Sequence, residues 1–399
     1  MKSNRLLIAL AALLQFSAAA RADLAAIFTN ATLTTHRAVP RRPSIIFIEC
    51  HGLAFGDLSC YGQTNFQTPN LDRLAAEGVR FTHYSGGAES PATTAMLLAG
   101  KNSPANHDEL NLAQQLRKNG YHTGLIGEWT FDRQPWLHGF DDFAGFFTDA
   151  EAQDFYAERI WRYPHVTYDE NNHERSRFLD HEMLYYNTGG KKGTYLPDLL
   201  VTAMLNFVKN NVPDAANHYR PFFLLANFPA PRTVKAGADE FPVPSDAPFT
   251  GEAWPQAAKN RAALITRLDA GIGRLFEQLD KSGMTNNVAI FFSSSSAPEK
   301  FADTNLNFLL PKNNFPDTNN PAPPPLPMIV HWPKTIPAGQ VSGLRWTAAD
   351  FAPTALEIGY VNLATNFTGM SILPLLHGRP GTNTPALPDL PDRNLPQGQ

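Results

Sequence analysis

Continuous apolar runs recur along the chain and are separated by segments with helical patterns. Three of these runs are residues 44–48, 221–228 and 288–292. Apolar runs that do not alternate with polar residues predict strands buried on both faces of a sheet. Ligands of such sheets bind beyond the carboxyl ends of the strands, so the residues after 48 are the first place to look for chemistry.

Helical patterns lie between these runs. Apolar residues recur at helical spacing from Arg261 to Leu279. Thr68 and Pro69 are a typical N-cap and first helical residue, and Gly78 is a typical helix end. Residues 112–130 predict a helix, a turn and a short strand. The alternation predicts an α/β fold with a central, mostly parallel mixed sheet and helices on both faces.

Composition supports a globular protein with a sizeable core. The chain has 399 residues, 43% of them hydrophobic, and a formal net charge of −4. That length suits one large domain or two smaller ones. The near-neutral charge and the absence of a basic run argue against a nucleic-acid partner.

The N-terminus has the pattern of a signal peptide. Lys2 and Arg5 precede the short apolar stretch Leu6–Phe16, and Ala20-Arg21-Ala22 fits a cleavage site. We therefore expect a secreted or periplasmic protein. No later stretch is long and apolar enough to predict a membrane span. The expected organisation is a signal peptide (residues 1–22), a linker (23–41), one domain (42–378) and a Pro-rich tail (379–399).

The chain has two cysteines, Cys50 and Cys60. In an exported protein two cysteines are able to form a disulfide. Their positions, one at a strand end and one in a loop, leave the pairing open.

A hydroxyl residue, Ser90, opens the segment Ser90–Gly100, in which Ala95 to Leu98 give a helix an apolar face. The simplest interpretation is that Ser90 is an N-cap. The alternative is chemical, because the unpaired N–H groups and the dipole at a helix N-terminus stabilise an anion or an attacking oxygen.

Several segments resemble the sulfatase family. The block after residue 48 contains Gly-Asp-Leu, Cys-Tyr-Gly and Thr-Pro-Asn-Leu-Asp-Arg-Leu-Ala, all of which are similar to family elements. The matching segments are Glu49–Gly62, Thr68–Phe81, Leu112–Thr130 and His138–Asp141. The similarity extends roughly over residues 42–378. It implies a sulfatase/alkaline-phosphatase-like fold, with a C-terminal subdomain that is reduced or absent here.

The resemblance also implies a calcium or magnesium ion held by an Asp-Asp pair and an Asp-Asn pair. In this chain the first pair aligns with His51 and Gly52, and the second with Ser294 and Ser295. Hard divalent cations prefer several oxygen ligands, mostly carboxylates. No carboxylate stands at these four positions, so we expect no metal cofactor.

By the same resemblance, Ser90 aligns with the residue that becomes formylglycine, the catalytic nucleophile. The family's Arg, Lys and His residues around the sulfate align with Thr94, Glu128, Thr130 and Arg232. Glu128 reverses a charge, and a carboxylate close to a bound sulfate repels it. These replacements predict a degenerate active site.

Two substitute chemistries remain open. A zinc site needs carboxylate and imidazole ligands that lie close together. Such ligands are available if Glu49, His51, Glu89 and Glu128 converge. Ser90 with His51 and a carboxylate is the residue set of a serine hydrolase. Neither set has a diagnostic spacing.

These observations favour a secreted pseudoenzyme that binds a sulfated glycan or another sulfate ester. The alternative is an active sulfatase or other hydrolase that uses Ser90 as a plain nucleophile or as a formylglycine precursor. Calcium is expected only in that case. A third interpretation, a structural surface protein, predicts no ligand selectivity.

Overall fold

The computed structural model describes residues 42–377, with gaps at residues 88, 132–133, 153, 172–173, 235–239, 299–324 and 363–365. The predicted signal peptide (residues 1–22), linker (23–41) and Pro-rich tail (379–399) lie outside the described residues. Within the described part, no helix combines the length and the apolar character that a bilayer crossing requires.

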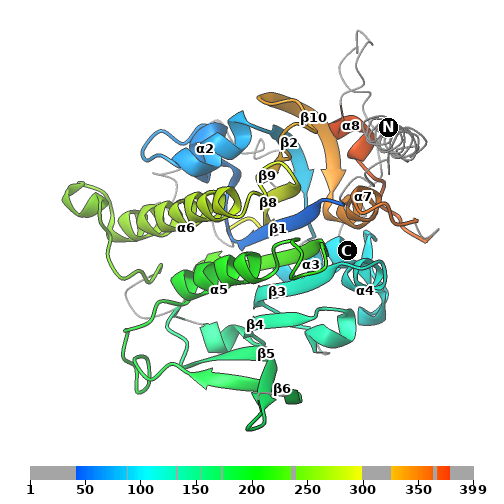
Figure 1. The fold of residues 1–399 in the computed structure, drawn as a ribbon. Coiled ribbons are helices and arrows are strands. Elements are labelled where there is room, and N and C mark those ends of the chain that lie inside the picture. The colour runs from blue at the N-terminus through cyan, green and yellow to red at the C-terminus, as the bar shows by residue number, and fades with distance from the viewer. Residues whose placement is uncertain are drawn as a thin grey trace, which may run out of the picture. The chain divides into compact units, whose positions relative to one another are not determined.

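The described strands form one mixed sheet in the order β10-β2-β9-β8-β1-β7-β3-β4-β5-β6 (Figure 1). The strands are β1 (Ser44–His51), β2 (Val79–Ser85), β3 (His122–Glu128), β4 (Asp142–Phe146), β5 (Arg159–Tyr168), β6 (Glu174–Met183), β7 (Phe222–Pro231), β8 (Val288–Ser296), β9 (Leu326–His331) and β10 (Gln340–Thr347). β1 is parallel to β7 and β8, and β3 is parallel to β7 and β4. β10 is parallel to β2. β9 is antiparallel to both of its neighbours, β2 and β8, and β5 is antiparallel to β4 and β6. The prediction of an α/β fold with a mostly parallel mixed sheet is confirmed.

Helices cover both faces of this sheet (Figure 1). They are α2 (Pro69–Ala76), α3 (Ser90–Ala99), α4 (Leu112–Lys118), α5 (Leu196–Asn210), α6 (Gln256–Lys281), α7 (Phe351–Ile358) and α8 (Leu373–Leu376). Ile45 and Phe47 of β1 pack with residues of α3, α4 and α7. Ile46 and Ile48 pack with residues of α2, α5 and α6. Burial of both faces explains why the β1 sequence is a continuous apolar run.

Three local predictions need correction. β1 continues beyond residue 48 to His51, because β7 and β8 pair with it from both sides up to that residue. α6 begins at Gln256, before Arg261, because its first turns are helix formers without the leucine repeat. The N-cap interpretation of Ser90 is wrong, since Ser90 is the first residue of α3 and Glu89 is the N-cap.

The two cysteines do not pair. Cys50 lies buried in β1, and Cys60 lies in the short 3₁₀ helix η2 (Ser59–Tyr61). Both thiols are free, so the structure contains no bridge between the end of β1 and the loop that follows it.

A buried ion pair fixes the loops at the carboxyl ends of the central strands. Arg261 of α6 pairs with Asp57 of the 3₁₀ helix η1 (Phe55–Asp57), and both side chains are at most 1% exposed. Arg261 Nη2 donates to the Gly52 carbonyl and Nη1 to the Pro231 carbonyl, each at 2.9 Å. Asp57 also accepts the N–H of Ala54 at 2.6 Å. One guanidinium therefore joins α6 to the chain after β1 and to the end of β7.

Replacement of this arginine tests that role. We expect Arg261→Leu to lower the free energy of unfolding by about 3–5 kcal/mol, because it leaves the Asp57 charge buried without its partner. Urea unfolding followed by circular dichroism measures the change.

Arg274→Leu is the matched control, because Arg274 lies exposed on the same helix. We expect this variant to stay within about 0.5 kcal/mol of the wild type. Equal effects of the two substitutions would contradict a special role for Arg261.

Candidate functional site

The aligned residues gather at the carboxyl edge of the sheet, where the parallel strands β1, β3, β7 and β8 end. His51 is the last residue of β1, and Glu128 is the last residue of β3. Ser294 and Ser295 lie just before the last residue of β8. Arg232 directly follows β7. Parallel strands end on the same side of a sheet, which is why residues far apart in the sequence meet here.

Hydroxyl groups form the first part of the site. The Ser90 and Ser295 hydroxyl oxygens are 2.7 Å apart and share a hydrogen bond. Thr94 Oγ1, one helical turn after Ser90, donates to Glu49 Oε2 at 2.7 Å. Ser90 and Thr94 are 3% and 2% exposed. The Ser90 hydroxyl is therefore buried and bonded to another neutral hydroxyl.

Glu49 is a buried carboxyl group beside these hydroxyls. Its side chain is fully buried, and its Oε1 atom has no hydrogen-bond partner. Burial raises its pKa to about 8, against the lowering effect of the Thr94 hydrogen bond and with a further rise from the charge of Glu128. Glu49 is therefore mostly uncharged at neutral pH and adds no anionic ligand to the edge.

Charged side chains form the second part. Glu128 Oε2 lies 3.4 Å from His51 Nδ1 and 3.9 Å from Arg232 Nη1, and its side chain is 3% exposed. Arg232 pairs more closely with Asp149 and donates to the Asp149 carbonyl at 3.4 Å. The Arg232 guanidinium thus faces two carboxylates, so its charge is already balanced before any anion arrives.

The four aligned metal positions do not fit a calcium or magnesium ion. Ser294 Oγ lies 2.9 Å from the Cys50 carbonyl oxygen and accepts the N–H of Leu53 at 3.1 Å. Ser295 Oγ is engaged with Ser90. Gly52 has a φ of +80°, and a Cβ atom there would lie 2.8 Å from the Arg232 Cα atom, so the backbone leaves no room for an aspartate. Its carbonyl oxygen already accepts from Arg261.

The two substitute chemistries gain no support from the geometry. Among the described residues, no three His, Cys, Asp or Glu side chains are arranged to hold a metal ion. Glu89 is exposed at the N-cap position of α3. Ser90 bonds to Ser295 rather than to His51, so no serine–histidine pair is recorded. Thr130 lies half-buried just after β3.

Sequence reasoning missed three residues that shape the site. Asp149 lies in the 3₁₀ helix η5 (Asp149–Ala152) and neutralises Arg232. Asn227 of β7 donates to the Glu128 carbonyl at 3.2 Å. The sequence could have identified Arg261 as a buried charge, because it lies at helical spacing with the buried Leu264 and Leu268, where an arginine is unusual. No sequence pattern identifies Asp149 or Asn227.

Comparison with known proteins identifies relatives over most of this chain. A protein-family model described as Sulfatase matches residues 43–359. The N-acetylgalactosamine-6-sulfatase of Homo sapiens is 26% identical over 377 aligned positions, covering 85% of this chain and 67% of the relative. The N-acetylglucosamine-6-O-sulfatase of Bacteroides thetaiotaomicron is 24% identical over 425 positions, covering 88% and 74%. The arylsulfatase of Hemicentrotus pulcherrimus is 25% identical over 384 positions, covering 86% and 63%.

Solved structures share the fold. The complex of Ps i-CgsB with k-i-k-neocarrahexaose aligns with a TM-score of 0.63 at 24% identity, covering 84% of this chain and 76% of that chain. BT4656 in complex with its substrate D-glucosamine-2-N,6-O-disulfate aligns with a TM-score of 0.62 at 22% identity, covering 84% and 80%. The expected alkaline-phosphatase-like α/β fold is thereby confirmed.

The buried Glu49 predicts a specific pH dependence of stability. Its folded-state pKa of about 8 lies above the ordinary value of 4.5. Between these two values the unfolded chain loses the proton and the folded chain keeps it. Stability therefore falls as pH rises through this window, by at most about 1.4 kcal/mol per pH unit, and levels off above it. Glu49→Gln removes this contribution.

Urea unfolding from pH 5 to pH 8.5 measures the effect. We expect the stability of Glu49→Gln relative to wild type to increase with pH, by a few kcal/mol in total. Glu252→Gln, at an exposed position, is the matched control and should parallel the wild type. A Glu49→Gln curve that also parallels the wild type would show that Glu49 is not held neutral.

Proposed function

The chain belongs to the sulfatase family, and on that premise we propose that it binds a sulfated glycan or another sulfate ester without hydrolysing it. The observation that carries the proposal is the state of the four aligned metal positions. Ser294 and Ser295 are committed to hydrogen bonds within the protein, Gly52 has no side chain, and His51 contacts Glu128.

The consequence for catalysis is quantitative. Metal and oxyanion interactions each typically contribute several kcal/mol of transition-state stabilisation. Each 1.36 kcal/mol changes the rate about tenfold. Loss of the metal ligands, together with the Arg, Lys and His of the sulfate clamp, therefore removes many orders of magnitude. Glu128 adds a repulsion of about 4 kcal/mol for an anionic group 4 Å away near the surface, offset in part by Arg232.

The proposed ligand class comes from the relatives. The curated relatives are named as sulfatases of N-acetylgalactosamine and N-acetylglucosamine sulfates, and two solved relatives hold k-i-k-neocarrahexaose and a disulfated glucosamine. Loss of turnover in a lineage of this kind leaves binding of the same ligand class as the simplest retained property.

An active hydrolase is the alternative. One observation favours it: Ser90 is the first residue of α3, and the first backbone N–H groups of a helix have no partner within the helix. A plain serine hydroxyl is nevertheless a weak nucleophile without a base, and its recorded partner is the hydroxyl of Ser295.

We also propose that the protein is secreted or periplasmic, on the charged and apolar pattern of residues 1–22. Intact-mass measurement of exported protein is the test. A chain that begins near Asp23 supports the proposal, and retention of Met1 refutes it.

Turnover of a chromogenic aryl sulfate tests the catalytic part. We expect no hydrolysis above background by wild type, Ser90→Ala or Ser90→Cys, because Ala92 and Thr94 replace the Pro and Arg that accompany the nucleophile in the family signature. Ser90→Ala is the control for contaminating sulfatase. Wild-type activity that disappears in Ser90→Ala would overturn the proposal in favour of the hydrolase.

A further inference from the structure

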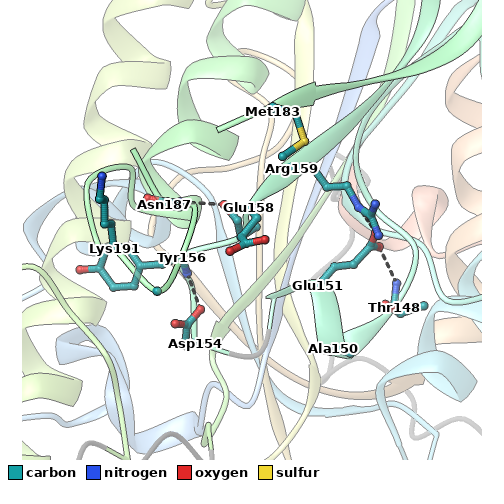
Figure 2. A pocket seen from close by; sticks show the side chains of 12 residues that line it. Thr148, Ala150, Glu151, Asp154, Tyr156, Glu158, Arg159, Met183, Asn187 and Lys191 are labelled. Carbon is teal, nitrogen blue, oxygen red and sulfur yellow. Dashed lines mark hydrogen bonds and ion pairs between the residues drawn. The ribbon is translucent and has the colours of Figure 1, made fainter. Parts of the chain in front are cut away.

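A cavity of about 760 Å³ lies beside the carboxyl edge, between the segment after β4 and the loop after β6 (Figure 2). That volume is within the range of small-molecule sites. Its lining contains charged residues of both signs, namely Glu151, Asp154, Glu158, Arg159 and Lys191, together with apolar residues such as Met183. The helix η5 forms part of the wall and is the element that Arg232 holds through Asp149.

Buried hydrogen bonds hold the cavity in shape. Asn187 is 1% exposed, and its amide donates to the carbonyls of Ala157 at 2.7 Å and Thr194 at 2.8 Å. Its Oδ1 atom accepts the N–H groups of Gly193 and Thr194. The carboxamide therefore ties the loop after β6 to the segment after β4. A site fixed in this way loses little conformational freedom when a ligand binds.

Glu151 and Arg159 have structural roles in the opposite wall. Glu151 accepts from the N–H groups of Phe147 and Thr148, from Trp161 Nε1 and from Arg159 Nε. The Arg159 guanidinium also lies over the Trp161 ring, 5.5 Å from its centroid. These contacts already use the charges of both residues.

Three charged groups remain with hydrogen-bonding capacity toward the cavity. Asp154 accepts the Tyr156 N–H through Oδ1, and Glu158 accepts the Gly189 N–H through Oε1. Within the described part of the chain, no partner is recorded for the second oxygen of either carboxylate or for the ammonium group of Lys191. Figure 2 shows all three around Tyr156, apart from the Glu151–Arg159 pair.

We propose that this cavity binds one saccharide unit that carries a single anionic substituent. Asp154 and Glu158 accept from sugar hydroxyls, which are good donors to carboxylates, and Lys191 binds the sulfate or carboxylate group. Among the lining residues, Lys191 is the cation outside the Glu151–Arg159 pair. The neighbouring Lys192 lies over the Tyr156 ring, 5.6 Å from its centroid. Two carboxylates beside Lys191 favour a singly charged sugar over a multiply sulfated one. The proposal rests on the proposed function and places its ligand here, away from the crowded Ser90 position.

Two exposed aromatic side chains stand on the same loop as the lining residues Asn187, Gly190 and Lys191. Tyr185 and Tyr186 are 74% and 77% exposed, and they precede Asn187 on the loop after β6. Exposed aromatic rings next to a pocket offer flat apolar surfaces with a polar tip, and the apolar face of a neighbouring sugar ring packs on such a surface.

Ligand-observed NMR titration tests the site, with galactose 6-sulfate and unsubstituted galactose as probes. We expect Lys191→Gln to weaken binding of galactose 6-sulfate about tenfold and to leave galactose unchanged, because only the charge-assisted contact is lost. Asp154→Asn and Glu158→Gln should weaken both sugars about threefold or more. Lys209→Gln on the exposed surface of α5 is the matched control, and cooperative unfolding confirms that each variant folds.

The outcomes separate this proposal from the one before it. Wild-type binding that Lys191→Gln and Asp154→Asn leave unchanged would overturn the cavity as the site and leave the proposed function standing. Binding followed by release of sulfate would refute the proposed function, while a raised KM in Lys191→Gln would still support the cavity. No binding of galactose 6-sulfate by the wild type would overturn the cavity as a site for a singly charged sugar, and the aryl sulfate assay tests the proposed function separately.

Discussion

The Arg261–Asp57 pair is the interaction on which the carboxyl edge depends. The guanidinium of α6 reaches the carbonyls of Gly52 and Pro231, so it fixes the turns that present His51 and Arg232. Neither ion is exposed to solvent, and each would be strongly unfavourable alone. The pair therefore fixes the turns at this edge through contacts within the protein.

Charge at the edge is balanced internally. Glu128 contacts His51 and Arg232, Arg232 contacts Asp149, and the buried Glu49 holds its proton. A sulfatase-type site needs the opposite condition, an excess of positive charge that an incoming sulfate neutralises. Charged groups with unused hydrogen-bonding capacity also lie farther along the same edge, in the cavity around Tyr156. Arg232 connects the two regions, because it holds the helix η5 that walls the cavity.

The sequence predicts the fold well because the fold depends on local patterns. The run at residues 44–48 has no polar residue to face solvent, so only a strand covered on both sides suits it. Motif alignment also placed Ser90, Glu128, Arg232, Ser294 and Ser295 at one edge. The protonation state of the neighbouring Glu49 was not predictable, since its pKa depends on burial and on Thr94 and Glu128. The Arg232–Asp149 pair and the Asn187 network form between segments that come together only in the folded chain. No spacing of residues in the sequence therefore predicts them.

Calcium binding tests most directly the claim that the carboxyl edge has no ligand set for a hard cation. Isothermal titration of metal-free protein with calcium chloride, paired with the Tm at each calcium concentration, is the measurement. We expect no saturable heat and an unchanged Tm. One calcium ion bound per chain, with a Tm that rises as binding saturates, would contradict the claim.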